Sequence, residues 1–227
     1  MSKSPPAASS FLRCEPLEDR LVPNATSFVT SLYNNLLYRA PDASGLTYWV
    51  DQLKSGALTD VQVAQDFWRS PEHRGVEVDF YYSQFLGRPA DPAGRAFWIS
   101  KLENGMTELE VAGQFLTSAE FLADHDSAVA YIDALYAAIL NRPPSLSDLS
   151  YWGNILASQG DGAVTIGILT STEAYTGIVD NDYVNYLGRL PDSGGLSYWV
   201  TQLQNGTGSV ESVAEGILGS AEYAALH

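Results

Sequence analysis

Apolar positions along the chain follow the spacing of α-helices. Phe28, Leu32, Tyr33, Leu36 and Leu37 share one face of a predicted first helix, because residues three and four apart lie on the same side of a helix. No stretch shows the alternation of apolar and polar residues that is typical of a half-buried strand. We therefore predict an all-α fold.

A second helix is predicted just after the first, with Leu46, Trp49, Val50 and Leu53 on one face. Its predicted end is Gly56, because glycine accepts the left-handed conformation that often closes a helix. The corresponding residues further along the chain are Gly105, Gly160 and Gly206.

A third helix is predicted after each of these glycines, and its start is clearest at Thr107. Thr107 and Glu110 have the spacing of a capping box, in which each side chain accepts a hydrogen bond from a backbone N–H at the start of the helix. The apolar stripe of this helix consists of Val111, Ala112, Phe115 and Leu116. We expect three to four short helices in each unit.

These elements recur in four tandem copies of about fifty residues. Each copy carries an arginine and a tryptophan ten residues apart, at Arg39 and Trp49, Arg88 and Trp98, Arg142 and Trp152, and Arg189 and Trp199. A Ser-x-Glu triplet begins 19 to 21 residues after each tryptophan and ends at Glu72, Glu120, Glu173 and Glu222. Such a period indicates repeats that bury their apolar faces against one another.

Composition separates a leader from the repeats. Residues 1–26 are rich in Pro, Ser and Ala, and we predict a flexible segment in which the single cysteine, Cys14, is an inert thiol. We assign copies 1 and 2 to residues 27–126 and copies 3 and 4 to residues 127–227, with one continuous domain as the alternative. Both a globule and an open solenoid are compatible with this spacing.

The chain is strongly acidic, with 12 Lys and Arg against 27 Asp and Glu and a formal charge of −15. This charge opposes binding to nucleic acids and to anionic membrane surfaces. No apolar run is long enough to span a bilayer, and the first residues lack the apolar stretch of a secretory signal. We expect a protein or a surface polysaccharide as partner, with no nucleic acid and no membrane insertion.

Three copies contain a Pro-Asp corner, with Ala90 between the proline and the aspartate in copy 2, and its carboxylates are the ligand candidates of the chain: Asp42, Asp91 and Asp192. We interpret each as the N-cap of the second helix. The alternative is that these carboxylates bind a cation or a glycan hydroxyl. The third copy has Ser145 in place of the aspartate, and serine is a good cap but a poor metal ligand, which favours capping.

The repeat arginines make up four of the 12 basic residues, so their placement is not part of a general basic face. We hypothesise that each acts as an internal clasp, pairing with a Ser-x-Glu carboxylate or stacking on a repeat tryptophan. The alternative is capture of an anion. The repeat tryptophans lie beside Leu and Val, so we predict that they belong to the core; the alternative is an exposed row that stacks on sugars.

Candidate catalytic groups are few. The histidines are His73, His125 and His227, and none recurs with the repeat. Pro71 follows Ser70 directly, so Ser70 is interpreted as a helix N-cap rather than a nucleophile. We predict that the protein is not an enzyme and uses no cofactor or metal, with an unrecognised hydrolase as the alternative.

Two segments resemble known sequences. The pattern LLYRAPDxxGLxYWVxxLxxG at residues 36–56, continued by VAxxF at 63–67 and SxE at 70–72, resembles the bacterial domain of unknown function family numbered 4214. The resemblance covers about residues 27–227 and departs most in the third copy. The leader segment LEDRLVP, at residues 17–23, resembles a segment near the start of many exported or surface proteins of planctomycete bacteria.

The family resemblance implies a helical module of secreted and surface-associated proteins, with no established activity and no catalytic residues to carry over. We therefore expect a non-catalytic binding or scaffold module, located outside the cell or at its surface. A glycan-binding accessory module is the alternative function, and the cytoplasm is the alternative location.

Overall fold

The structure is a computed structural model, and it describes residues 24–227. Every element in this range is helical and no strand is present within it, which confirms the all-α prediction. Cys14 and most of the predicted leader lie outside the described residues. The last three leader positions belong to the fold, because Asn24 caps the first helix and Ala25 begins it. The helical part therefore starts slightly earlier than residue 27.

Four sets of helices correspond to the four copies. Copy 1 contains α1 (Ala25–Leu37), α2 (Ala43–Lys54) and α3 (Asp60–Trp68). Copy 2 contains α4 (Pro71–Leu86), α5 (Pro92–Glu103), α6 (Glu108–Leu116) and α7 (Ala119–Asp124). Copy 3 contains α8 (Ala128–Leu135), a π-helical segment (Tyr136–Leu140), α9 (Leu146–Gln159) and α10 (Asp161–Leu169). Copy 4 contains α11 (Thr172–Leu187), α12 (Ser193–Gln204), α13 (Val210–Leu218) and α14 (Ala221–Leu226).

Two long helices are each shared by neighbouring copies. The first turn of α4 carries the Ser-x-Glu triplet of copy 1, and the rest of α4 is the first helix of copy 2. In the same way α11 links copies 3 and 4. Between copies 2 and 3 the corresponding helix is interrupted and forms α7 and α8.

Local predictions of helix faces and ends agree with the structure. The five apolar residues assigned to one face of α1 are all buried. Thr107 and Glu110 form the predicted capping box of α6. Gly56 and Gly206, at the predicted ends of α2 and α12, have φ values of 68° and 66°, in the left-handed region where glycine is favoured.

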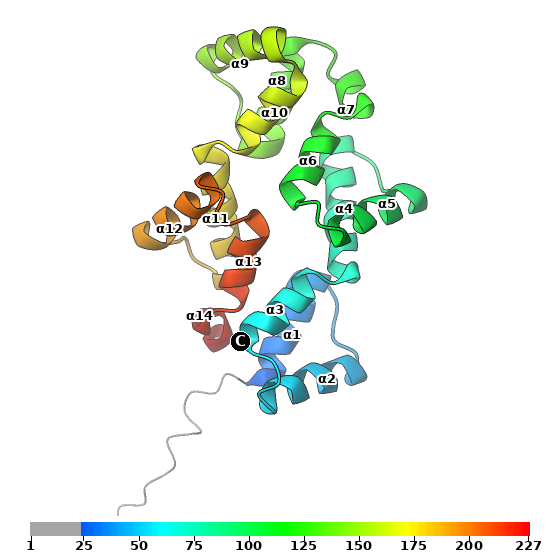
Figure 1. The fold of residues 1–227 in the computed structure, drawn as a ribbon, viewed down its shortest axis with the longest axis vertical. Coiled ribbons are helices and arrows are strands. Elements are labelled where there is room, and N and C mark those ends of the chain that lie inside the picture. The colour runs from blue at the N-terminus through cyan, green and yellow to red at the C-terminus, as the bar shows by residue number, and fades with distance from the viewer. Residues whose placement is uncertain (1–23) are drawn as a thin grey trace, which may run out of the picture.

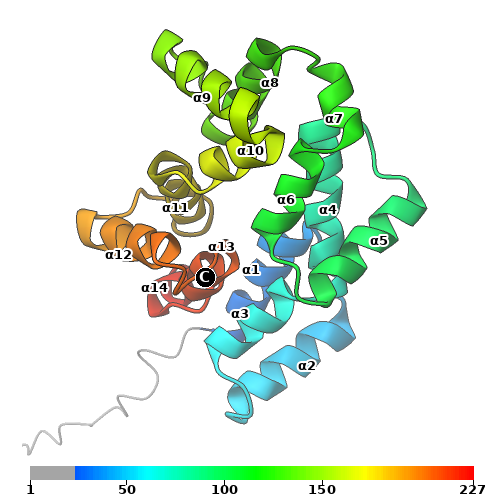
Figure 2. The same ribbon diagram turned by 45° about the horizontal axis from the view of Figure 1, so that its top comes forward.

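The four copies form a closed arrangement in which the first copy lies against the last (Figure 1; Figure 2). The third helix of each copy faces the middle of the molecule, whereas the second helices α2, α5, α9 and α12 lie on its outside. α3 packs against α13, and α6 packs against both α10 and α13. Because α3 and α13 belong to the first and last copies, the chain forms a closed assembly rather than an open solenoid.

Two buried clusters form the core, and they do not follow chain order. One joins residues 28–68 to residues 175–224, and the other lies within residues 78–169. Copy 1 therefore shares a core with copy 4, and copy 2 with copy 3. This grouping differs from the assignment of 27–126 and 127–227 as separate pairs, because the apolar stripes of the third helices pair across the molecule.

Among residues 24–227, no helix combines the length and the apolar character needed to cross a membrane.

Candidate functional site

Each repeat arginine binds the Ser-x-Glu carboxylate of its own copy. Its Nε and Nη2 donate to the two carboxylate oxygens at 2.5–2.9 Å, in the pairs Arg39–Glu72, Arg88–Glu120, Arg142–Glu173 and Arg189–Glu222. The guanidinium carbon also lies 4.7–5.3 Å from the ring centre of Tyr33, Tyr82, Tyr136 or Tyr183. The predicted pairing with glutamate is present in every copy, but the stacking partner is a tyrosine instead of the predicted tryptophan.

Each repeat arginine donates hydrogen bonds to its glutamate carboxylate and to the backbone carbonyl of the next residue. In copy 2, Arg88 Nη1 donates to the Pro89 carbonyl, while Nε and Nη2 bind Glu120. Glu120 thus occupies the Nε–Nη2 edge of the guanidinium, which could otherwise bind an anion through two parallel bonds, and this counts against anion capture. The bond from Arg88 lowers the pKa of Glu120. Both side chains are about 40% exposed, at 39% and 41%, so solvent screens the pair.

Arg88→Met is expected to lower the melting temperature, because it removes both the ion pair and the stacking on Tyr82. Methionine retains much of the apolar stem, so the change reports mainly on the guanidinium. Thermal unfolding followed by circular dichroism measures the effect. An unchanged melting temperature would show that the clasp contributes nothing to stability.

The Pro-Asp corners act as helix caps. Asp42, Asp91 and Asp192 each accept a hydrogen bond at 2.8–2.9 Å from the backbone N–H of the glycine three residues later. Hydrogen bonding lowers the pKa of all three, with the Ser44 hydroxyl as the largest cause at Asp42. In copy 3, Ser145 caps α9 as predicted. Within residues 24–227, no three His, Cys, Asp or Glu side chains converge to form a metal site.

The glycine of the corner makes room for the clasp tyrosine. A Cβ added to Gly94 would lie 2.2 Å from the Tyr82 hydroxyl oxygen. Gly94→Ala is therefore expected to destabilise the protein by about 1–3 kcal/mol, because Tyr82 would have to move away from Arg88. Urea unfolding measures the change.

Gly153→Ala in α9 is the matched control, because nothing lies within 4 Å of its added Cβ. Alanine there should stabilise the helix by up to about 1 kcal/mol. Equal destabilisation in both variants would contradict the steric explanation.

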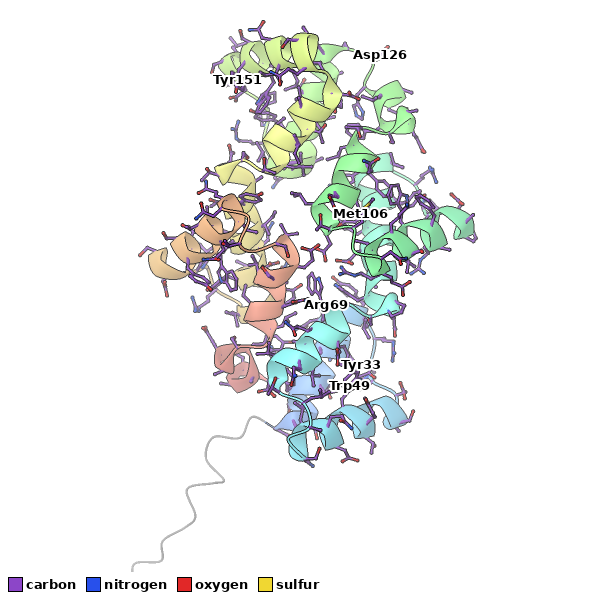
Figure 3. All side chains as sticks on the ribbon, viewed as in Figure 1. Tyr33, Trp49, Arg69, Met106, Asp126 and Tyr151 are labelled. Carbon is purple, nitrogen blue, oxygen red and sulfur yellow. The ribbon has the colours of Figure 1, made fainter. Side chains whose placement is uncertain are left out.

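The repeat tryptophans pack against the two core clusters, as the prediction that they belong to the core expected, and they are half-buried rather than fully enclosed. Trp49 packs on Phe67 at a centroid distance of 5.1 Å, and Trp98 packs on Phe115 at 5.0 Å. Figure 3 shows Trp49 beside the clasp tyrosine Tyr33, at the corner between α1 and α2. The indoles thus cover the edge of the core.

The residue before each tryptophan is an exposed aromatic. These side chains are 52–59% exposed, and each ring packs edge-on against its tryptophan at 4.9–5.0 Å. They are Tyr48, Phe97, Tyr151 and Tyr198, on the outer helices α2, α5, α9 and α12. The sequence prediction concentrated on the tryptophans and missed this set of exposed aromatic residues, although the aromatic type recurs at the same position in all four copies.

A cluster of buried charges lies where α3, α4, α6 and α13 meet. Arg74 Nη1 donates to Glu77 at 2.8 Å and to Glu108 at 2.6 Å. The indole N–H of Trp68 donates to the same oxygen of Glu108 at 2.7 Å. Trp68, Arg74 and Glu108 are each less than one tenth exposed. One buried guanidinium therefore serves two buried carboxylates.

Helix α13 contributes two further acids to this central cluster. Glu215 accepts hydrogen bonds from Nε and Nη2 of Arg69 at 2.6 and 2.9 Å. Glu211 accepts a hydrogen bond from the backbone N–H of Glu108 at 2.7 Å, and its second oxygen, Oε2, is buried with no partner among the described residues. These contacts connect copy 4 to copies 1 and 2.

Protonation in the cluster is set by burial. Burial raises the pKa of Glu108 well above its ordinary value, and the neighbouring carboxylates of Glu77 and Glu211 raise it further. Burial lowers the pKa of His73, so this histidine is neutral and does not add a positive charge near neutral pH. The Nδ1 atom of His73 lies 3.0 Å from the Leu36 carbonyl oxygen.

The sequence prediction missed the central cluster because its members are not repeat residues. Arg74 stands where the other copies have Leu122, Tyr175 and Ala224, and Glu211 stands where two others have Val61 and Leu109. A charge at a position where the other copies have an apolar residue is the signal that could have located the cluster.

The family comparison agrees with this repeated geometry. The family model described as "Domain of unknown function (DUF4214)" matches residues 8–76, 78–125, 115–178 and 177–227. No curated protein and no solved structure gives a significant match to this chain. Because the matches extend over nearly the whole sequence, the chain belongs to the DUF4214 family, of which it carries four tandem copies.

Proposed function

We propose that this protein is a non-catalytic, multivalent binding or scaffold module of an exported or surface-associated bacterial protein, and that its outer helices make the contacts. The observation that supports this proposal is the set of four exposed aromatic residues on the outer helices: Tyr48, Phe97, Tyr151 and Tyr198. Each exposed ring is held edge-on by a half-buried tryptophan, so little side-chain entropy is lost when a partner covers it.

The recurring polar residues have structural tasks that favour a binding role over catalysis. The repeat arginines and glutamates bind one another, and the corner aspartates cap helices. The Nδ1 atoms of His73 and His125 lie within hydrogen-bonding distance of backbone carbonyl oxygens. Variation between copies is therefore left to the exposed positions around the exposed aromatic residues.

A glycan is the second candidate for the partner, favoured by the groups beside the exposed tyrosines. In copy 3, Ser150 and Asn154 flank Tyr151 on the exposed side of α9, and in copy 4, Ser197 and Thr201 flank Tyr198. An aromatic face next to hydroxyl or amide groups offers a polyhydroxylated ligand both an apolar contact and hydrogen bonds.

Binding of the purified chain to isolated bacterial envelope polysaccharide and to envelope protein tests the proposal. A variant with serine at all four aromatic positions should lose binding by about 10²–10⁴-fold, whereas single substitutions should lose much less, because separate weak contacts act together.

The matched control replaces four other exposed apolar residues with serine: Phe80, Val129, Val184 and Leu226. These residues lie on α4, α8, α11 and α14 rather than on the outer helices. Equal binding by the aromatic variant and the control, or no binding of the native chain to either fraction, would contradict the proposal.

A further inference from the structure

The central cluster contains more acidic than basic side chains. Its members come from the ends and faces of α3, α4, α6 and α13, and all of them are largely buried except Arg69, whose side chain is 62% exposed. They are Glu77, Glu108, Glu211 and Glu215 on the acidic side, and Arg69 and Arg74 on the basic side. Four carboxylates thus meet two guanidinium groups, so the acidic side chains of the cluster outnumber the basic ones by two.

Glu211 is the carboxylate with an unused oxygen. The residue is only 9% exposed, and its Oε1 accepts the Glu108 backbone N–H while its Oε2 has no hydrogen-bonding partner among the described residues. An ionised carboxylate in such a place is costly unless a donor or a positive charge accompanies it. The arrangement around Glu211 therefore lacks one cationic donor.

An open cavity of about 380 Å³ lies beside this carboxylate. Its volume is within the range of small-ligand sites. The side chains that carry its charge and polarity belong to Arg69, Arg74, Glu103, Ser209, Glu211 and Glu215. Figure 3 shows Arg69 and Met106, which both line the cavity, facing the centre of the molecule between α3 and α6.

A second cavity of about 200 Å³ adjoins the first, since Thr107, Ser209 and Glu211 line both. Its other side chains are mostly apolar and belong to Leu109, Tyr175, Leu203 and Val210. Glu211 thus stands between a charged compartment and an apolar one. A ligand that matches both has a positive head and a short apolar stem, as lysine and arginine side chains do.

We propose that the two adjoining cavities at the junction of copies 1, 2 and 4 bind an organic cation, whose ammonium or guanidinium head pairs with Glu211 and whose stem lies against Leu203 and Val210. Glu103 and Glu215 add negative potential around the head. The ligand would bridge α6 and α13, so binding also strengthens the closure of the four copies.

The charges of the cavity disfavour other classes of ligand. Arg69 binds Glu215 through two nitrogens, and Arg74 is shared by Glu77 and Glu108, so an anion meets paired guanidinium groups inside an acidic surround. No three metal-ligating side chains converge within residues 24–227. A cation that carries its own hydrogen-bond donors remains as the class that fits.

Isothermal titration calorimetry of the full chain tests this site. Agmatine serves as a free organic cation, and the peptide amide Gly-Ser-Arg-Ser-Gly presents the same guanidinium as part of a partner chain. We expect one-to-one binding of at least one probe. Tighter binding of agmatine identifies a free small molecule as the natural source, and tighter binding of the peptide identifies a protein partner. The same peptide with neutral citrulline in place of arginine should not bind.

Two variants and a charge-matched control locate the site. Glu211→Gln should weaken binding at least tenfold, and Met106→Phe, which narrows the first cavity, should weaken it without any change of charge. Asp133→Asn on α8 removes the same charge from an exposed position and should leave the affinity unchanged. Thermal unfolding confirms that each variant is folded. If Glu211→Gln does not fold, the affinity of Met106→Phe decides the test.

Four results would overturn the proposal: no binding of either cationic probe, equal binding of the citrulline peptide, stronger binding of pyrophosphate than of agmatine, or native affinity in both cavity variants. None of these results bears on the exposed aromatic residues Tyr48, Phe97, Tyr151 and Tyr198, since none of them lines either cavity.

Discussion

Arg74→Met is expected to destabilise the folded protein by about 3–5 kcal/mol at neutral pH, because it leaves buried carboxylates without their shared cation. Arg74 is 7% exposed and donates to both Glu77 and Glu108. The loss should shrink as the pH falls, since burial raises the pKa of Glu108 and its protonation removes charge that Arg74 otherwise balances. Urea unfolding followed by circular dichroism at pH 7 and pH 5 measures both effects.

Arg95→Met is the matched control for this experiment. Arg95 also pairs with an acid from a neighbouring helix, since its Nε donates to Asp79 at 2.9 Å, but both side chains are substantially exposed. Its replacement should cost less than about 1 kcal/mol, because solvent screens the pair. Similar losses in the two variants would mean that burial of the central cluster does not govern its energetics.

Asp182→Asn is expected to stabilise the protein above pH 7 relative to the native chain. Burial raises the pKa of Asp182 from 3.8 to about 7. The folded state therefore binds a proton that the unfolded state has already lost. As the pH rises from about 4 to about 7, this carboxyl should cost the native fold about 2–4 kcal/mol in unfolding free energy. The unfolding free energy of the asparagine variant should not show this decline.

Unfolding free energies at several pH values between 4 and 9 measure the difference between the two chains. The comparison is needed because the formal charge of −15 also increases repulsion as acids ionise, and both chains share that effect. Glu120→Gln should change the pH dependence of the unfolding free energy in the opposite direction. The native pKa of Glu120 is lowered by Arg88, so its stabilising effect is present above the ordinary glutamate pKa and is lost on acidification. Parallel pH profiles for native and Asp182→Asn chains would contradict the assigned pKa.

The repeat motif could be understood largely from the sequence because its interactions are local. Helix caps such as Asp91 and Ser70 act on backbone groups within three residues, so their residue types and spacing suffice to predict them. The pairing of Arg88 with Glu120 was predictable from its recurrence, although the residues are 32 positions apart. The stacking of Arg88 on Tyr82 was not, because the tyrosine also satisfies the apolar spacing of α4 and gives no separate signal.

The sequence by itself determined the all-α class, the four copies, several helix ends and the composition of each corner. Only the tertiary structure decided that copy 1 packs on copy 4, that the copies close, and that Arg74, Glu108 and Glu211 meet at the centre. The physical reason lies in the range of the interactions. Caps and periodic faces depend on neighbours along the chain, whereas a buried charge is tolerated only where partners from distant segments reach it, and Glu108 and Glu211 are 103 residues apart.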